Sequence, residues 1–230
     1  MMSLSVIVPF YNEGDLLEKS VNRLLKNNIY EQILLIDNNS TDNSPNIAKN
    51  LASNNKNIFS FKTDIRKGKG VALARAKDLI TSTHVVIHDA DLEYFPDDIF
   101  EMFEVSKQYP NSMILGSRFI GTKERKNVYS RTYLANKMMS IFFSIINFYN
   151  ISDIATCYKL MPSDFFKKTN LRENGFSIEI EMLSKFLKFN RSIKEVPIKY
   201  EGRSYSEGKK IKTIDGIKYL FNTIKYRFIN

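Results

Sequence analysis

The sequence predicts an α/β fold, with a mainly parallel central sheet and helices on both faces. Runs of apolar and β-branched residues alternate with stretches of helical spacing over the first 120 residues. Such alternation is typical of parallel sheets whose strands are joined by helices. Of the 230 residues, 43% are hydrophobic and 26% are charged, as in ordinary globular domains.

The first half of the chain holds the regular part of this pattern. Strands are expected at 4–10, 32–37, 58–62, 83–89 and 113–119, and helices at 15–26, 42–54, 69–80 and 96–107. The first helix places Leu17, Val21 and Leu24 at helical spacing. The second has Ser44 as its expected N-cap, with Pro45 in the first turn.

The pattern is less regular after residue 120. A basic loop at 121–131 is followed by an apolar helical segment at 133–149, a strand at 157–161, a helix at 176–189 and a strand at 193–199. The tail, 211–228, places apolar residues on one helical face and cations elsewhere. Because no repeat or low-complexity linker interrupts the chain, we expect one domain over 1–230.

Composition limits the classes of function. The chain carries 34 Lys+Arg against 25 Asp+Glu, a formal net charge of +9, which favours an anionic partner: nucleic acid, a phosphorylated small molecule or an anionic membrane. Its one cysteine, Cys157, excludes an internal disulfide framework and favours a reducing compartment. The longest apolar candidate, 138–151, is shorter than the roughly 20 residues of a spanning helix. The N-terminus has no basic region before its apolar run, which predicts a first strand rather than a signal peptide.

Acidic residues follow three of the predicted strands. Glu13 follows the first, Asp37 ends the second, and Asp89 and Asp91 end the fourth. Ligands of such sheets bind beyond the carboxyl ends of the strands, so these side chains should converge on one cleft.

The segment HVVIHDADLEYFPDD, 84–98, predicts a metal site. On a strand Asp89 and Asp91 would point the same way, and an all-oxygen set suits Mg²⁺ or Mn²⁺. Two acids at this spacing would occur about 2.7 times by chance in such a composition, so the position at a strand end carries the argument. His84 and His88 are expected to be structural. The RKGKG run at 66–70 is expected to be a solvated turn, with a contact to a nucleotide as the alternative.

These residues, taken together, resemble family 2 glycosyltransferases. The matching segments run in order: LSVIVPFYNEGDLL, ILLIDNNSTDNS, RKGKGVALARA, HVVIHDADLEYFPDDI, GSRF, DIATCYKLM, GFSIEIEML and EVPIKYEGRSYSEGKKI. The DADLEY form and the last two segments are most similar to the branch of dolichol-phosphate mannosyltransferases and polyprenyl-phosphate glycosyltransferases. One departure is Asn38-Asn39, where that branch usually carries Asp-Gly.

The resemblance implies a GT-A-type nucleotide-sugar-binding fold, with a nucleotide-binding half at 1–120 and an acceptor-side half at 121–230 that ends in the basic amphipathic tail. It also implies roles for single residues. The nucleoside pocket would be lined by Pro9, Tyr11, Glu13 and Asp37; the metal and diphosphate motif would be Asp89, Ala90 and Asp91, with Glu93 as a further metal ligand. Arg118 would face the donor, and Arg203 and Lys209 would reach the diphosphate from a loop that closes over it.

The activity implied is that of an inverting, Mg²⁺- or Mn²⁺-dependent hexosyltransferase. Mannose or glucose would pass from GDP-mannose or UDP-glucose to a polyprenyl (dolichyl-type) phosphate at the cytoplasmic membrane face. We expect a cytoplasmic or peripheral membrane protein, no nucleic-acid partner, and a chain that allows a homodimer.

Alternatives remain open at this point. Transfer to a sugar hydroxyl of a glycan or glycolipid would need a carboxylate base, for which Asp153, Glu179 and Glu181 are candidates. A non-catalytic basic nucleic-acid-binding protein is a remote alternative, because no nucleic-acid recognition motif is found. The apolar segment 133–149 suits a helix at a membrane interface, a core helix or a dimer contact.

Overall fold

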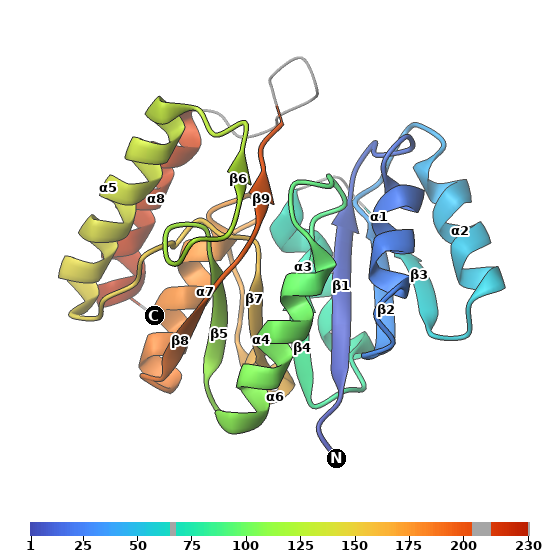
Figure 1. Ribbon diagram of the computed structural model, residues 1–230, viewed down its shortest axis with the longest axis horizontal. Coiled ribbons are helices and arrows are strands. Elements are labelled where there is room, and N and C mark those ends of the chain that lie inside the picture. Colours follow the sequence, from blue (N-terminus) through green and yellow to red (C-terminus); the bar gives the residue numbers. More distant parts are fainter. Residues whose placement is uncertain (65–67, 204–212, 230) are drawn as a thin grey trace.

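The computed structural model describes residues 1–64, 68–203 and 213–229. Its centre is a seven-stranded sheet of order β3-β2-β1-β4-β7-β5-β8 (Figure 1). The strands are β1 (Leu4–Phe10), β2 (Tyr30–Asp37), β3 (Ile58–Lys62), β4 (His84–Ile87), β5 (Met113–Ser117), β7 (Lys159–Pro162) and β8 (Ile193–Pro197). Only β7 runs antiparallel to its neighbours β4 and β5 among the pairs described. The predicted α/β class with a mainly parallel sheet is confirmed.

The central strands are buried on both sides. Successive residues of β1, such as Val6, Ile7 and Val8, point to opposite faces, yet none of the three is exposed to solvent. Helices therefore cover both faces, which is the usual condition of a parallel sheet. These helices are α1 (Leu17–Leu25), α2 (Ser44–Asn54), α3 (Lys69–Ala76), α4 (Pro96–Gln108), α6 (Ser163–Lys168) and α7 (Ile178–Phe189).

Two long helices stand at one side of the molecule, beyond the sheet. They are α5 (Ser130–Asn147) and α8 (Thr213–Phe228), which pack against each other, while α8 also packs on α7 (Figure 1). A small parallel pair, β6 (Arg125–Lys126) with β9 (Tyr200–Glu201), lies between this helix pair and the sheet. Within the described residues no helix is long and apolar enough to cross a bilayer.

Several predicted boundaries moved, and one shift matters for the site. The strand expected at 83–89 ends at Ile87, so Asp89 and Asp91 lie beyond the strand and not on one of its faces. The strand expected at 113–119 ends at Ser117, and the one at 157–161 runs instead from Lys159 to Pro162. The helix expected at 69–80 ends at Ala76 and continues as a short 3-10 turn.

The predicted cap of α2 was wrong. Asn43, not Ser44, is the N-cap, and its side chain makes no capping hydrogen bond. The Ser44 hydroxyl is used differently: it donates to Asp42 and accepts a hydrogen bond from the Glu13 backbone N–H at 2.9 Å. The start of α2 is thereby tied to the loop that follows β1.

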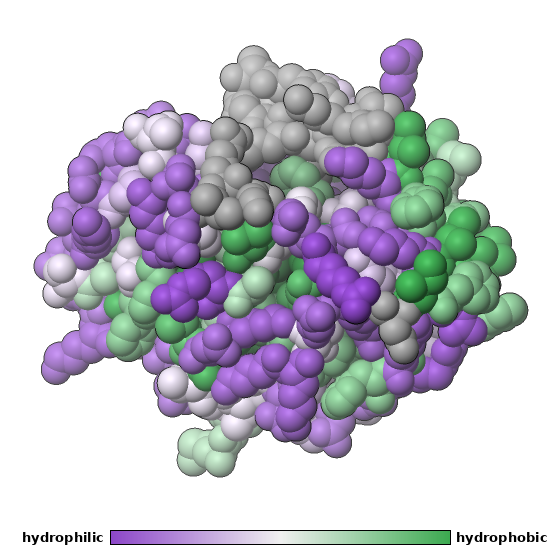
Figure 2. Space-filling model, turned by 180° about the vertical axis from the view of Figure 1, so that it is seen from behind, coloured by the Kyte–Doolittle hydropathy of each residue, from purple (hydrophilic) through white to green (hydrophobic). Residues whose placement is uncertain are grey.

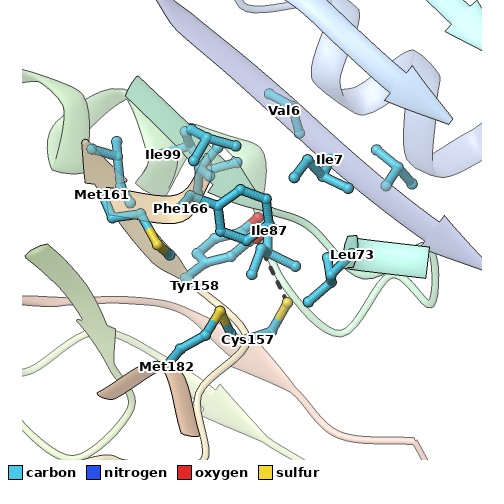
Figure 3. Close-up of a cluster of buried hydrophobic side chains, with 14 of the residues drawn as sticks. Val6, Ile7, Leu73, Ile87, Ile99, Cys157, Tyr158, Met161, Phe166 and Met182 are labelled. Atoms are coloured by element: carbon cyan, nitrogen blue, oxygen red, sulfur yellow. Dashed lines mark hydrogen bonds between the residues drawn. The ribbon is translucent and has the colours of Figure 1, made fainter. Parts of the chain in front are cut away.

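The core beneath the strand ends is densely packed. Figure 3 shows Ile87, Leu73, Cys157 and Tyr158 gathered between the sheet and its helices. The Cys157 thiol lies 3.6 Å from the Ile87 carbonyl oxygen, to which it donates. Segment 156–158, which precedes β7, thus packs directly against the end of β4 and fixes the floor of the cleft described next.

Candidate active site

A cleft of about 540 Å³ opens at the carboxyl ends of β1 and β4. Among the predicted site residues, those that line it are Pro9, Tyr11, Glu13, Asp89, Ala90, Asp91, Glu93, Arg118 and Arg203. Asp37 lies behind its neighbour Asn38, which lines the wall in its place. Lys209 falls outside the described residues. The three strand ends therefore meet at one cleft as predicted, but the Asp37 side chain, which was expected to line it, does not.

The end of the cleft formed by β1 and β2 carries buried polar atoms. Asp37 accepts a hydrogen bond from the Ser40 backbone N–H at 2.8 Å through Oδ1. Its Oδ2 and the Asn38 Oδ1 are buried and have no hydrogen-bond partner within the part of the chain that the structure describes. Buried acceptors without partners cost free energy unless a ligand satisfies them. This end of the cleft is therefore suited to a ligand that donates hydrogen bonds.

The Asn38-Asn39 pair has a conformational explanation. Asn39 adopts φ of 61°, in the left-handed region that glycine occupies most easily. Asparagine tolerates this region better than other residues with side chains. The chain can therefore make a turn at Asn39 for which glycine would otherwise be favoured.

The carboxylates of the predicted metal motif are each held by a cation or a donor. Asp89 forms an ion pair with the Lys69 ammonium at 2.8 Å, and Asp91 with the Arg203 guanidinium at 3.2 Å. Glu93 accepts hydrogen bonds from the Tyr200 hydroxyl at 2.7 Å and from the Arg203 backbone N–H at 2.9 Å. The acidic segment thus holds Tyr200 of β9 and Arg203 against the cleft.

The motif nevertheless carries more negative charge than its cations balance. Burial and the neighbouring Glu93 and Asp89 carboxylates raise the pKa of Asp91 to about 7. Burial would also raise the pKa of Asp89, but the ion pair with Lys69 outweighs it and keeps that pKa below its ordinary value. A divalent cation bound by these oxygens would relieve the repulsion, and oxygen ligands suit Mg²⁺ or Mn²⁺.

The donor set fits a shared metal better than a fully enclosed one. Within the described ranges, no three His, Cys, Asp or Glu side chains are grouped closely enough to hold an ion. A Mg²⁺ site commonly combines one or two carboxylates with substrate phosphate oxygens and water. Asp89 and Asp91 supply such a pair, while Glu93 is engaged by Tyr200 and Arg203.

Lys69 is the main site residue that the sequence did not reveal. The RKGKG run was expected to be a solvated turn, which is wrong for Lys69, because its side chain is only 8% exposed and lies between Asp89 and Glu179. The flanking glycines allow this approach: Gly68 has φ of 98°, and a Cβ on Gly70 would lie 1.8 Å from the Glu173 carbonyl oxygen. The glycine spacing was the available signal, but its partner segment, 173–175, lies far away in sequence.

Arg118 faces the cleft, and its side chain is held in place by Asp153. Its guanidinium makes a two-pronged ion pair with Asp153, at 2.7 and 2.8 Å, and stacks over the Tyr200 ring at 4.9 Å. Burial would lower the pKa of Arg118, but Asp153 reverses this and raises it. The guanidinium is therefore a fixed positive charge in the cleft wall.

The three candidate bases have different surroundings. Asp153 is fully buried and bound to Arg118, and Glu181 is fully buried and accepts hydrogen bonds from the Arg172 and Glu173 backbone N–H groups. Only Glu179 of the three lines the cleft, and its carboxylate pairs with Lys69 and Lys159. Both oxygens of this carboxylate are therefore already engaged by ammonium groups.

The two histidines are structural, as expected. His88 is buried, and its ring nitrogens form hydrogen bonds with the Ser20 and Tyr158 hydroxyls at 3.0 and 2.9 Å. Burial lowers the pKa of His88 to about 4. His84 forms a hydrogen bond with the Pro110 carbonyl oxygen on the side of the sheet away from the cleft.

Comparison with known proteins agrees with this geometry. The model of glycosyl transferase family 2 matches residues 5–169. The UDP-N-acetylglucosamine–dolichyl-phosphate N-acetylglucosaminyltransferase of Methanococcus voltae is 27% identical over 237 residues, covering 95% of this chain and 94% of that protein. The dolichol-phosphate mannosyltransferase of Pyrococcus furiosus is 27% identical over 232 residues, covering 98% of this chain and 64% of that protein.

Solved structures share the fold. Glucosyl-3-phosphoglycerate synthase from Mycobacterium tuberculosis, in complex with Mn²⁺, UDP-glucose and phosphoglyceric acid, superposes with a TM-score of 0.75 at 14% identity, over 98% of this chain and 79% of that one. Mannosyl-3-phosphoglycerate synthase from Rubrobacter xylanophilus gives 0.71 at 16% identity, over 98% and 73%. The family model covers well over half of the chain, and the fold is that of GT-A glycosyltransferases. The chain therefore belongs to glycosyl transferase family 2 and is a glycosyltransferase.

Proposed function

We propose that this enzyme transfers a sugar from a nucleotide-diphospho-sugar to a polyprenyl phosphate. The observation that carries the proposal is the shape of the cleft, which joins the acidic motif at one end to the α5–α8 helix pair at the other. Met139 of α5 and Tyr219 of α8 line the same cleft as Asp89 and Asp91. The relatives named for dolichyl-phosphate transfer support this choice of acceptor.

The donor would bind at the end of the cleft formed by β1, β2 and β4. Asp89 and Asp91 would hold Mg²⁺ or Mn²⁺, and the ion would neutralise charge on the donor diphosphate. Asp37 and Asn38 offer buried acceptors to the nucleoside. Arg203 lies within reach of the same phosphates, because its guanidinium already contacts Asp91. Fixed cations aimed at a leaving diphosphate stabilise the charge that grows as the C1–O bond breaks.

The acceptor would approach from the helix pair. The apolar residues of α5 and α8 that remain exposed are Leu134, Met138, Ile141, Ile145, Ile217, Leu220, Phe221, Ile224 and Phe228. Figure 2 shows hydrophobic side chains gathered at the edge of the molecule where this helix pair lies. Of the alternatives for 133–149, a helix buried in the core does not fit, because Phe143 is buried but Ile141 is 54% exposed and Ile145 is 64% exposed.

This face suits the surface of a membrane. The exposed apolar residues are accompanied by cations of the same helices, among them Lys137 and Lys218. Apolar side chains with interspersed lysines are typical of helices that lie in the headgroup region of anionic membranes. The enzyme would then act as a peripheral protein at the cytoplasmic membrane face and receive the lipid phosphate directly into the cleft.

The chemistry requires no strong base on the enzyme. A phosphate oxygen of the acceptor is already anionic and can attack C1 of the sugar from the side opposite the leaving diphosphate. Such a displacement would invert the configuration at C1. The engagement of Asp153 and Glu181 in structural contacts agrees with this route.

The alternative acceptor is a sugar hydroxyl, and transfer to a hydroxyl would depend on Glu179 as the base. Glu179 is the candidate base that lines the cleft, but it bridges two lysines. If a hydroxyl were the acceptor, Glu179→Gln would abolish turnover at every pH without a change in donor affinity.

The direct test is a transfer assay. The purified enzyme is incubated with Mn²⁺, a radiolabelled nucleotide-sugar and a polyprenyl phosphate in detergent; GDP-mannose, UDP-glucose and UDP-N-acetylglucosamine are compared. We expect label from one donor to enter the organic phase, and none with the matched polyprenol that lacks the phosphate. Transfer to glycolipid or free-sugar hydroxyls, with none to the polyprenyl phosphate, would overturn the proposed acceptor.

A further inference from the structure

Four charged side chains of alternating sign run inward from the floor of the cleft. Asp89 lies 2.8 Å from the Lys69 ammonium, which lies 2.8 Å from one oxygen of Glu179. The other oxygen of Glu179 lies 2.6 Å from the Lys159 ammonium. The Lys159 ammonium also donates to the Ile154 and Thr156 carbonyl oxygens, so the inner end of the row is held by backbone.

The row is buried, and its charges sum to zero. The side chains of Asp89, Lys69, Glu179 and Lys159 are 23%, 8%, 3% and 0% exposed. Buried charges are strongly destabilising unless each has a partner of opposite sign. Loss of one member therefore forces its neighbours to find new partners.

The row also joins the two halves of the enzyme. Lys69 begins α3, and the Gly70 backbone N–H donates to the Asn174 carbonyl oxygen at 2.7 Å. Glu179 lies in the first turn of α7, just after that segment, and Lys159 begins β7. The carboxylate that holds Lys69 is thus supplied by the acceptor-side half, whereas Lys69 and Asp89 belong to the nucleotide-binding half.

We infer that Glu179 is a positioning residue that shares the Lys69 charge with Asp89 and so leaves Asp89 able to bind a divalent cation. The Lys69 ammonium lies 2.8 and 3.0 Å from the two Asp89 oxygens and 2.8 Å from one Glu179 oxygen, so its charge is divided between the two carboxylates. Without Glu179, Lys69 has only Asp89 among these partners, and the ammonium competes with a metal ion for its oxygens. This inference rests on the proposed function, in which Asp89 and Asp91 hold the metal.

The test measures Mn²⁺ binding and needs no turnover. Electron paramagnetic resonance follows the free Mn²⁺ signal during titration of the protein, with Mn²⁺ alone and with UDP or GDP added. We expect Glu179→Gln to weaken Mn²⁺ affinity about tenfold, the size of one lost charge-assisted hydrogen bond. Lys69→Met removes the competitor and should tighten Mn²⁺ binding about threefold.

Two further variants distinguish this effect on Mn²⁺ affinity from a general loss of folded structure. Lys159→Met keeps the contact between Glu179 and Lys69 and should not weaken Mn²⁺ binding. The pair Lys159→Met with Glu179→Gln removes both inner charges, avoids an unpaired buried ammonium, and should weaken Mn²⁺ binding as Glu179→Gln does. It serves as the readout if Glu179→Gln alone does not fold.

The decisive comparison is the double variant of Lys69 and Glu179. If Glu179 acts through Lys69, Glu179→Gln should change Mn²⁺ affinity less than about threefold in the Lys69→Met background. An undiminished effect there would mean that Glu179 acts directly through space and would overturn the inference. Equal weakening by Lys69→Met and Glu179→Gln would point to a structural role and would also overturn it. Absence of Mn²⁺ binding by the unmodified enzyme, with either nucleotide, would overturn both this inference and the proposed metal.

Discussion

Among single residues, Asp91 shows most clearly how function conflicts with stability. Its carboxylate is partly buried beside Glu93 and Asp89, and its ion pair with Arg203 does not fully compensate for them. The folded protein therefore keeps a charge cluster that costs free energy until a cation binds. Such unfavourable electrostatics are common at sites that bind metal and phosphate.

Replacement of Asp91 by Asn should stabilise the metal-free protein in a pH-dependent way. The pKa of Asp91 is about 7 in the folded protein and about 3.8 in the unfolded chain, so the folded state holds a proton that the unfolded state has released. Stability of the unmodified protein therefore falls between about pH 4 and pH 7, relative to the variant. The advantage of Asp91→Asn should reach about 4 kcal/mol at pH 8 and vanish near pH 4.

Urea unfolding at pH 4, 6 and 8 in the presence of a chelator would measure this difference. Glu104→Gln, at an exposed position of α4, is the matched control and should show no such trend. If the difference in free energy of unfolding between Asp91→Asn and the unmodified protein does not vary with pH, this prediction is contradicted.

The site residues could be predicted only in part, for a physical reason. The strand-end carboxylates and Arg118 belong to short local motifs, so their positions in the cleft followed from the sequence. Lys69 was missed because its role depends on Glu179, more than a hundred residues away. The prediction that Asp89 and Asp91 lie on the same face of a strand was wrong, because β4 ends at Ile87 and both residues lie in the following loop.

At the scale of elements, the close contact between α3 and segment 173–175 connects the two halves. A methyl group on Gly70 would collide with the Glu173 carbonyl oxygen. Gly70→Ala should therefore separate α3 from this segment and destabilise the protein by about 2–4 kcal/mol, despite the higher helix propensity of alanine. It should also lower activity, because Lys69 moves with the start of α3.

Thermal unfolding and initial rates would check this prediction against Gly216→Ala. A Cβ at Gly216, in α8, meets only the Met139 sulfur at an ordinary 3.7 Å, so that control should be neutral or stabilising. Equal effects of the two substitutions would show that the contact with segment 173–175 does not require glycine.

The helix pair α5–α8 makes a second prediction at this scale. Ile145→Glu and Phe221→Glu place charges on its exposed apolar face and should reduce binding to anionic vesicles at least fivefold. Phe100→Glu is the control, since Phe100 is 46% exposed on α4, away from this face. Sedimentation with phosphatidylglycerol vesicles measures the effect. Equal vesicle binding by all three variants would contradict membrane contact at this face and would favour another partner there, such as a second copy of the chain.

The strands and helices were easier to predict than the contacts between them. Each strand and helix expected in the first half is present, because periodicity reports local conformation directly. The antiparallel direction of β7 and the pairing of β6 with β9 were not predicted, since both depend on contacts between distant segments. The same limit applied to 133–149, whose apolar composition did not distinguish an exposed helix from a buried one.

For the whole molecule, the two halves contribute different chemistry to one cleft. Residues 1–120 supply the carboxylates at strand ends and Arg118, and residues 121–230 supply Asp153, which holds Arg118, together with β9 and the apolar helix pair. The net charge of +9 is consistent with the proposed anionic donor and the proposed anionic lipid surface. Membership of an enzyme family makes the early alternative of a non-catalytic basic protein wrong.

The proposed function depends above all on the acidic motif, which should bind a nucleotide-sugar through a divalent metal. Calorimetric titration with GDP-mannose, UDP-glucose and UDP-N-acetylglucosamine, with and without Mn²⁺, tests it most directly when repeated on Asp91→Ala. We expect one donor to bind, its binding to require Mn²⁺, and the substitution to abolish it. Binding that is equally strong without metal and in Asp91→Ala, or no binding of any donor, would contradict the claim.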